Sequence, residues 1–259
     1  MEYNNGRIYE GNWANNKRNG QGRMIYINLN IYEGNWANDK CSGKGIMKYK
    51  NGDIYEGNWE NDKCSGKGIM KYANGGIYEG EWLDNKRNGK GIMKYANGDI
   101  YEGNWKNNAQ QGEGIMKYAN GNIYEGNWVN NSTKGEGKKK YANGDIYEGK
   151  WGGLHFVVGI VKYANGDIYE GECSFRLPDS QGIMKYANGD IYEGKWIKGK
   201  KSGYFKITTL DKEIYTGICE DDNYIGEWTL TKSDKTTVKV TREGNVFKEI
   251  KRKKFLGIF

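Results

Sequence analysis

The sequence predicts an all-β protein, an elongated single-layer antiparallel sheet of stacked β-hairpins. Three observations support this prediction. A core of the form Ile-Tyr-Glu-Gly-x-Trp, as in residues 100–105, recurs along the chain, β-favouring residues alternate with polar ones inside each copy, and an Asn-Gly pair precedes many copies. The tyrosine of the core recurs every 23 residues, with one step of 22 after Tyr147, and such a period indicates stacked supersecondary units. The recurring tyrosines are Tyr9, Tyr32, Tyr55, Tyr78, Tyr101, Tyr124, Tyr147, Tyr169, Tyr192 and Tyr215.

Each repeat is expected to contain two short antiparallel strands. In one copy these are residues 54–59 and residues 67–72, and the residues between them, 60–66, are expected to form a polar loop. Asn-Gly pairs such as Asn51-Gly52 tolerate positive φ and lead into the next repeat. We therefore expect a continuous antiparallel meander with one hairpin per repeat.

Alternation assigns the side chains of each hairpin to two faces. One face is expected to carry Tyr55, Gly57, Trp59, Gly68, Met70 and Tyr72, and the other Ile54, Glu56, Asn58, Lys67, Ile69 and Lys71. A register that sets large side chains against small ones pairs Trp59 with Gly68 and places Glu56 opposite Lys71. A shift by two residues would keep the same faces. In the last repeat Cys219 replaces the tryptophan and Trp228 replaces the facing glycine, which supports the register.

Composition suits a thin sheet with an aromatic seam, because hydrophobic residues make up only 36% of the chain and aromatic residues 14%. The net charge of +7 is compatible with an acidic protein surface or an anionic membrane. We expect no membrane span, no signal peptide and an intracellular location. Cys41 and Cys64 lie one repeat apart, beyond disulfide reach, while Cys173 and Cys219 stand at tryptophan positions and are expected to be buried.

The domain organisation follows from the repeats. Residues 1–228 are expected to form an array of about ten 23-residue hairpin units, and residues 229–259 a degenerate C-terminal cap with a basic tail. Residues 236–240 still alternate, and residues 243–245 are expected to turn into a last strand.

The recurring Tyr-Glu-Gly-x-Trp, the later Gly-x-Gly and the following Tyr-x-Asn-Gly-Asp resemble the MORN repeat (membrane occupation and recognition nexus). This resemblance implies stacked hairpins in an elongated, bent sheet with an aromatic-lined groove. Few residues follow the repeats, so the chain resembles repeat-only members, similar to the cytoskeletal or ciliary proteins of radial-spoke heads. The chain departs from the pattern at Thr216, at Lys139 on the aromatic face, and in the loops of residues 151–182.

Catalytic chemistry has little support in the sequence. His155 is the single histidine, so only one base of the kind that activates a serine or cysteine exists. The Gly-x-Gly triplets lack the strand-to-helix context of a nucleotide site. We expect no enzyme activity, no cofactor and no metal.

A docking surface for proteins is expected where two adjacent loops break the polar pattern. The candidate docking residues are Leu154, Phe156, Val157, Phe175 and Leu177. Apolar side chains at exposed tips indicate a binding patch, with Phe156 and Phe175 as its anchors. The alternative is that the two loops pack on each other.

The aromatic groove is a second candidate, because it could hold an extended peptide or a helix. Such stripes are more often the core, and we interpret its residues as mainly structural. They are Tyr55, Trp59, Tyr72, Tyr78, Trp82, Tyr95, Tyr101 and Trp105.

The C-terminal tail is the candidate for binding an anionic membrane or an acidic partner. Its basic residues precede an apolar end, a pattern typical of a weak interfacial anchor, although a cap strand with solvated charge explains it as well. The residues concerned are Lys248, Lys251, Arg252, Lys253, Lys254 and Phe255. Nothing supplies base contacts, so no nucleic acid is expected.

The sequence thus favours a non-enzymatic scaffold that binds one or more proteins, in a cytoplasmic cytoskeletal or ciliary (axonemal) assembly as the resemblance implies. The alternative is a membrane-tethering module that binds anionic phospholipid. Homo-oligomers through an exposed edge strand are compatible with either function.

Overall fold

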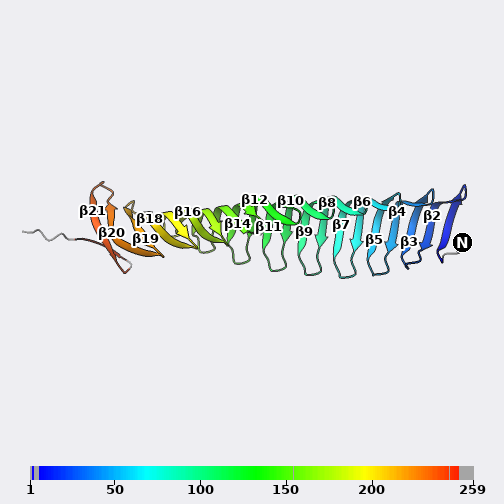
Figure 1. The fold of residues 1–259 in the computed structure, drawn as a ribbon, viewed down its shortest axis with the longest axis horizontal. Helices are drawn as coiled ribbons and strands as arrows, with labels where there is room; N and C mark the ends of the chain where they lie inside the picture. Colours follow the sequence, from blue (N-terminus) through cyan, green and yellow to red (C-terminus); the bar gives the residue numbers. More distant parts are fainter. Residues whose placement is uncertain (1, 3–5, 154, 245, 251–259) are drawn as a thin grey trace, which may run out of the picture. The chain divides into compact units, whose positions relative to one another are not determined.

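The described residues form 22 β-strands and no helix (Figure 1). The structure is a computed structural model, which describes residue 2 and residues 6–153, 155–244 and 246–250. Within that part of the chain, no helix exists that could cross a membrane. The strands are β1 (Ile8–Ala14), β2 (Lys17–Ile25), β3 (Ile31–Ala37), β4 (Lys40–Lys48), β5 (Ile54–Glu60), β6 (Lys63–Lys71), β7 (Ile77–Leu83), β8 (Lys86–Lys94), β9 (Ile100–Lys106), β10 (Ala109–Lys117), β11 (Ile123–Val129), β12 (Ser132–Lys140), β13 (Ile146–Gly152), β14 (His155–Lys162), β15 (Ile168–Ser174), β16 (Leu177–Lys185), β17 (Ile191–Ile197), β18 (Lys200–Thr208), β19 (Ile214–Glu220), β20 (Asn223–Thr231), β21 (Thr237–Glu243) and β22 (Val246–Glu249).

Contacts divide the chain into two units, Met1–Lys134 (unit 1) and Gly135–Phe259 (unit 2). In unit 1, strands β1 to β11 pair antiparallel in sequence order, each with the strand before and the strand after it. In unit 2, strands β13 to β22 do the same. The predicted open antiparallel sheet of stacked hairpins is therefore confirmed in each unit.

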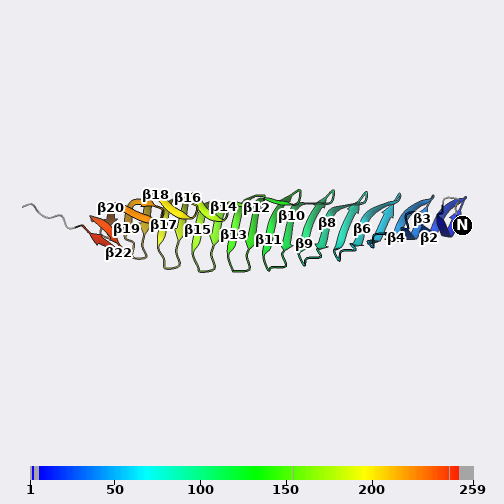
Figure 2. The same ribbon diagram turned by 60° about the horizontal axis from the view of Figure 1, so that its bottom comes forward.

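The turn inside each hairpin is shorter than predicted. Residues 60–66 do not form a polar loop, because only Asn61 and Asp62 separate β5 from β6. Their φ values are 51° and 66°, so this is a two-residue turn with both residues in the left-handed region, which Asn and Asp tolerate. The Asn-Gly pairs lie in the longer turns, where Gly52 has a φ of 92° and its N–H bonds to the Tyr49 carbonyl at 2.9 Å. Figure 2 shows these longer turns along one edge of unit 1.

The predicted faces are correct, but the predicted register is wrong by two residues. Tyr55 is opposite Met70 and Gly57 is opposite Gly68, after which a bulge brings Trp59 opposite Cys64. The physical reason is that the Tyr55 ring leans along the strand and covers the glycine pair. Large and small side chains are thus matched diagonally on one face rather than directly across the strands.

The glycine pair forms the seat of the buried tyrosine. Tyr55 is fully buried, and a Cβ atom added at Gly57 would lie 2.6 Å from its Oη. That hydroxyl donates a hydrogen bond to the Asn58 carbonyl at 3.0 Å. The same bond recurs at Tyr9, Tyr32, Tyr78, Tyr101, Tyr124 and Tyr169. Only glycine leaves room for the ring at both positions.

The tryptophans join consecutive repeats. Trp82 packs edge-on against Tyr78 of its own repeat and against Tyr55 of the preceding repeat, with ring centroids 5.2 Å apart in both cases. Its indole N–H donates to the Gly68 carbonyl at 3.2 Å. Such T-shaped pairs stabilise beyond the burial of their area, so this contact fixes the spacing of neighbouring hairpins.

Two repeats of unit 2 fill the seat with a different aromatic ring. Phe205 is opposite Gly194 and is fully buried, and the Trp228 ring covers Gly217. Tyr192 and Tyr215 are only half-buried there. The predicted direct pairing of Cys219 with Trp228 is wrong, since Cys219 is opposite Tyr224. All four cysteines are free and buried, as expected for Cys173 and Cys219.

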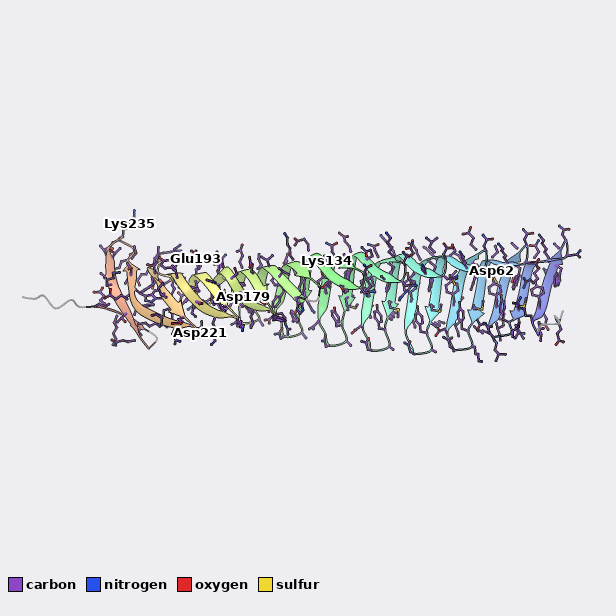
Figure 3. The ribbon with its side chains drawn as sticks, viewed as in Figure 1. Asp62, Lys134, Asp179, Glu193, Asp221 and Lys235 are labelled. Atoms are coloured by element: carbon purple, nitrogen blue, oxygen red, sulfur yellow. The ribbon has the colours of Figure 1, made fainter. Side chains whose placement is uncertain are left out.

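The polar face does not carry the predicted Glu–Lys ladder. Glu56 is opposite Ile69 and Ile46, because the register differs by two residues from the one predicted. Some glutamates of this row do form ion pairs with lysines on neighbouring strands. One is the pair between Glu193 (labelled in Figure 3) and Lys206, at 3.2 Å.

Two further strands follow the last repeat, as predicted for the described part of residues 229–259. Strand β21 pairs with β20, and β22 pairs with β21. The Phe247 ring stacks on Tyr215 at 4.4 Å, and the Arg242 guanidinium lies 3.9 Å from the centroid of Tyr224. These side chains cover the final part of the aromatic core.

Candidate functional site

Most of the predicted groove aromatics lie in the core. Tyr55, Tyr78 and Tyr101 are fully buried, and the tryptophans at 59, 82 and 105 are nearly so. Tyr72 and Tyr95 are half-buried, and burial raises the pKa of both phenols above the usual range. Only these two of the eight residues present part of a ring to the surface of unit 1.

An arginine lies beside this half-buried row. The Arg87 guanidinium lies 4.3 Å from the Trp105 ring centroid and donates to the Asn108 carbonyl at 2.9 Å. At the equivalent position Arg18 also forms an ion pair with Asp39, at 3.2 Å. The main role of both arginines is therefore a cation–π contact with the neighbouring tryptophan ring.

The predicted docking residues at the tips of unit 2 do not share one environment. Phe156 is 1% exposed, because its ring packs between Tyr147 and Trp151 at 5.3 and 5.4 Å. The expectation that Phe156 is an exposed anchor is therefore wrong. Val157 and Leu177 are exposed, whereas Leu154 lies outside the described residues.

Phe175 is the most exposed member of this group. It is 77% exposed, and His155 contacts its ring edge-on at 5.4 Å. The two tips thus touch through His155, so the alternative that the two loops pack on each other is correct in part. This contact nevertheless leaves most of the Phe175 ring in solvent.

The turn that carries Phe175 departs from the repeat in two ways. Phe175 and Arg176 have φ values of 48° and 70°, at positions where most other tight turns place Asn or Asp. In those turns the second side chain also accepts a hydrogen bond from the preceding hairpin, as Asp62 (labelled in Figure 3) does from the Cys41 N–H at 2.7 Å. Arginine has no acceptor atom, so Arg176 cannot make this bond.

A depression of about 420 Å³ lies beside these tips, on strands β14 to β17. Its lining combines branched aliphatic side chains with two carboxylates, two hydroxyls and one amine. The lining residues are Val157, Glu172, Cys173, Ser174, Asp179, Ser180, Lys195 and Ile197. Burial raises the pKa of the Cys173 thiol to about 12, so it stays protonated at neutral pH and is a poor nucleophile.

His155 and Lys139 are the remaining side chains that the sequence analysis singled out. His155, exposed at a tip, contacts Phe175, and no group of His, Cys, Asp or Glu in the described ranges could hold a metal ion. Lys139 lies over the Tyr141 ring at 5.1 Å, as predicted for the aromatic face, and burial lowers its pKa. Arg176 shares the same ring at 5.6 Å.

The basic tail is only partly described. Lys248 is exposed and forms an ion pair with Glu243 at 2.7 Å, so an in-chain carboxylate already balances its charge. Lys251, Arg252, Lys253, Lys254 and Phe255 lie outside the described residues.

A family model for the MORN repeat matches seven segments, which together cover more than half of the 259 residues. The chain belongs to the MORN-repeat family. The matched segments are residues 9–30, 32–54, 55–77, 78–100, 101–123, 124–146 and 192–204. The MORN repeat is a non-catalytic interaction module, and membership suggests a chain that interacts with proteins or lipids.

Other comparisons add nothing on function. The TCP10 domain of Danio rerio CPAP, solved in complex with a peptide of Danio rerio STIL, is 9% identical, with 95% of this chain and 100% of that chain covered and a TM-score of 0.37. The SAS-4 (dCPAP) TCP domain of Drosophila melanogaster is 11% identical, with 86% and 90% covered and a TM-score of 0.27. A streptogramin B lyase is 12% identical, with 92% and 88% covered and a TM-score of 0.19. Values this low carry no functional argument. No curated protein matches the sequence.

The parts of the chain outside the matched MORN segments contain its main departures from the repeat. Residues 147–191 include the Phe175 turn, and residues after 204 include Phe205 and Trp228. Ile218 and Ile225 also lie there, and Tyr204 is the last residue of the final matched segment. All three side chains are exposed, and the sequence analysis did not single them out. The alternation that assigned the faces of the third repeat would have found them, had it been applied to the last two repeats.

Proposed function

We propose that this chain is a non-enzymatic MORN scaffold that binds a partner protein through the tips of unit 2. The observation that carries the proposal is Phe175, a bulky exposed side chain held at positive φ. For a non-glycine residue the left-handed conformation costs about 1–2 kcal/mol, and Asn or Asp offsets this cost through local hydrogen bonds that Phe cannot make.

The described contacts offset this cost only in part. The ring is 77% exposed, so burial contributes little. The Arg176 carbonyl accepts a hydrogen bond from the Tyr147 hydroxyl at 3.3 Å, but the Arg176 side chain cannot accept the inter-repeat hydrogen bond that Asn or Asp accepts in the other turns. Residues held in costly backbone conformations concentrate at binding sites, which motivates the assignment of Phe175 as a docking anchor. A large aromatic anchor that enters a pocket of its partner is typical of protein interfaces.

The surroundings of Phe175 fit the rim of such an interface. Val157 and Leu177 are exposed beside it, and the depression on β14 to β17 adds the carboxylates of Glu172 and Asp179. At the position of Leu177 several other repeats have lysine, for example Lys63. The partner surface is therefore expected to combine an apolar pocket with basic side chains.

The setting that we propose is a cytoplasmic assembly of the cytoskeleton or cilium, of the radial-spoke-head type. MORN membership supports this setting, and no single residue does. We also propose ten repeats, with the hairpins that begin near Tyr147, Tyr169 and Tyr215 as diverged copies outside the family match. Tagging the chain in ciliated cells and testing whether it stays with the detergent-extracted axoneme would test the setting.

The docking proposal is tested by returning the tip to the repeat pattern. The variant Phe175→Asn with Leu177→Lys keeps the hairpin and removes both apolar side chains. Its matched control is Leu83→Glu, which removes a similarly exposed side chain beside a tight turn of unit 1. Proteins that co-purify with the wild-type chain at high salt should be lost with the tip variant and kept with the control. Full retention by the tip variant, with its fold intact, would exclude the tips as the docking site.

The alternative function is a tether that binds anionic phospholipid through the tail. The net charge of +7 and the basic residues 251–254 support it, whereas the ion pair of Lys248 with Glu243 does not. Co-sedimentation with phosphatidylcholine–phosphatidylserine vesicles, compared between the full chain and one ending at Ile250, would test the tether. Association of copies through edge strand β22 stays a prediction, which sedimentation equilibrium would check.

A further inference from the structure

The cross-strand pair Tyr204–Ile218, on the polar face where the last two repeats meet, carries neither a charge nor an amide. Where adjacent repeats meet, the facing residues are Lys44 and Asn58 between β4 and β5, and Tyr204 and Ile218 between β18 and β19. The other described pairs at this position each contain a charged or amide side chain. They are Gln21–Asn35, Lys67–Glu81, Lys90–Asn104, Glu113–Asn127, Val158–Glu172 and Gln181–Lys195.

The apolar pair extends onto a third strand. Ile218 is also directly opposite Ile225 of β20, at the position where the third repeat has Ser65. We call Tyr204, Ile218 and Ile225 the outer patch. Their side chains are 61%, 47% and 43% exposed, while the alternate residues Phe205 and Cys219 are buried on the core face. The outer patch therefore faces away from the aromatic core and is open among the described residues.

The chain itself provides a segment suited to this patch. After Ile250, whose N–H bonds to the Lys239 carbonyl on β21, the sequence continues for nine residues, Lys-Arg-Lys-Lys-Phe-Leu-Gly-Ile-Phe. Strand β22 is three strands from β19, or about 14 Å at about 4.8 Å per strand. Nine extended residues reach about 30 Å, which also covers the offset of Ile250 along the strands.

The charges near the patch match those of the tail. Glu220 and Glu227 are exposed and lie two residues from Ile218 and Ile225, on the same face of β19 and β20. Neither carboxylate takes part in the ion pairs of the described residues of unit 2. Four basic residues at 251–254 precede the apolar end, so the tail can place cations beside these glutamates and apolar side chains on the patch.

We propose that residues 251–259 fold back across β19 and β20 and bind the outer patch of the same chain. The apolar end of the tail contacts Tyr204, Ile218 and Ile225, and its basic residues lie beside Glu220 and Glu227. The outer patch is distinct from the Phe175 tips. Residues 251–259, which bind it in this proposal, are the same segment that the tether hypothesis assigns to a membrane. Partner capture by the tips is thus independent of this contact.

Disulfide trapping tests the proposal. A chain with Ile218→Cys and Ile258→Cys is oxidised at micromolar concentration, and the product is identified by non-reducing electrophoresis and peptide mass spectrometry. The native cysteines are buried, and burial raises the pKa of the neighbouring Cys219 thiol to about 11, so it competes poorly. The control pairs Ile258→Cys with Lys150→Cys on β13, the same repeat position nine strands from β22, or about 43 Å away. That distance exceeds the reach of the tail.

The expected result is an intramolecular disulfide with Ile218→Cys in most molecules and none with Lys150→Cys. Tethering gives an effective concentration on the order of mM, which favours the intramolecular product over dimers. In a second measurement, ending the wild-type chain at Ile250 should raise the fluorescence of a hydrophobic dye severalfold, and Ile218→Lys in that shortened chain should abolish the increase.

Three results would overturn the proposal. Equal trapping at Ile218→Cys and Lys150→Cys would show that the tail has no preferred site. A mainly intermolecular disulfide would assign the patch to the tail of a second copy. Tail-dependent co-sedimentation with phosphatidylcholine–phosphatidylserine vesicles, together with loss of the intramolecular disulfide in their presence, would place the tail on a membrane.

Discussion

The glycine seat of the buried tyrosine makes the sharpest stability prediction. A Cβ atom added at Gly68 would lie 2.6 Å from Cζ of Tyr55, closer than any normal contact, and the Tyr55 ring is packed against Trp59 and Trp82 with centroids 5.2 Å away. Gly68 has no positive φ, so the cost of alanine arises from this overlap. Overpacking of a core costs about 1–3 kcal/mol, and expulsion of the ring from its site would cost about 3–5 kcal/mol. We expect Gly68→Ala to reduce the free energy of unfolding by about 3 kcal/mol.

The assay is a double-mutant cycle measured by urea unfolding with tryptophan fluorescence. Tyr55→Ala alone should cost about 3–5 kcal/mol, because the fully buried ring contacts Trp59 and Trp82. Gly68→Ala in the Tyr55→Ala background should then cost less than about 1 kcal/mol, since the new methyl group enters the space that the ring has left. The coupling energy should therefore be at least about 2 kcal/mol.

Gly75→Ala is the control that separates overlap from backbone strain. Gly75 has a φ of 92° and no atom within 4 Å of an added Cβ, so only its backbone conformation opposes alanine, at about 1–2 kcal/mol. That cost should not change when Tyr55 is replaced. The explanation fails if Gly68→Ala costs less than about 0.5 kcal/mol, or costs the same with and without the Tyr55 ring.

Three further predictions concern pH, a turn and a link between repeats. Burial raises the pKa of Tyr124 and Tyr186 to about 12 from the ordinary value of 10.0, so the unfolded chain ionises first, and stability that is constant below pH 10 should fall between pH 10 and 12. A urea midpoint unchanged between pH 9 and pH 11 would contradict this. Phe175→Asn should raise stability by about 1 kcal/mol, because Asn tolerates the φ of 48°; a lower melting temperature would show that the turn is not strained. Asp53→Ala should cost about 1 kcal/mol, because the carboxylate accepts a hydrogen bond from the Ala73 N–H at 2.8 Å, whereas Asp53→Asn should retain most of it, as calorimetry can check.

Much of the fold could be predicted because each position is sampled repeatedly along the chain. Period and alternation determined the hairpins and the two faces correctly, since both follow directly from backbone geometry. The register could not be derived in the same way. Volume matching compared residues directly across the strands, whereas the ring of Tyr55 lies over Gly57 and Gly68, diagonally to its own Cα.

The turns and the site show two other limits of the sequence. The sequence predicts a turn at Asn-Gly, because both residues tolerate positive φ, and a polar loop at residues 60–66. The fold instead has a two-residue turn at Asn61 and Asp62 and gives Asn-Gly the longer connection. Phe156 and Phe175 look alike in the sequence as apolar residues near a tip. A bulge between β13 and β14 sets Phe156 opposite the core residue Trp151, and a bulge leaves no local signature in the sequence. Phe175 instead lies in the two-residue turn between β15 and β16.

Residues that depart from the repeat pattern fall into two groups, those that the core buries and those that it leaves exposed or strained. Phe205 replaces a glycine but fills the seat that Tyr192 leaves, so the core stays packed and no function needs to be invoked. Phe175 and the Tyr204–Ile218 pair are different. Phe175 keeps a backbone at positive φ with a ring that is 77% exposed, and the Tyr204–Ile218 pair leaves apolar area exposed, so the described contacts bury neither group. Such costs persist where another contact offsets them. This difference is the physical reason for placing the partner at Phe175 and the tail on the outer patch, and not on the more strongly altered core around Phe205.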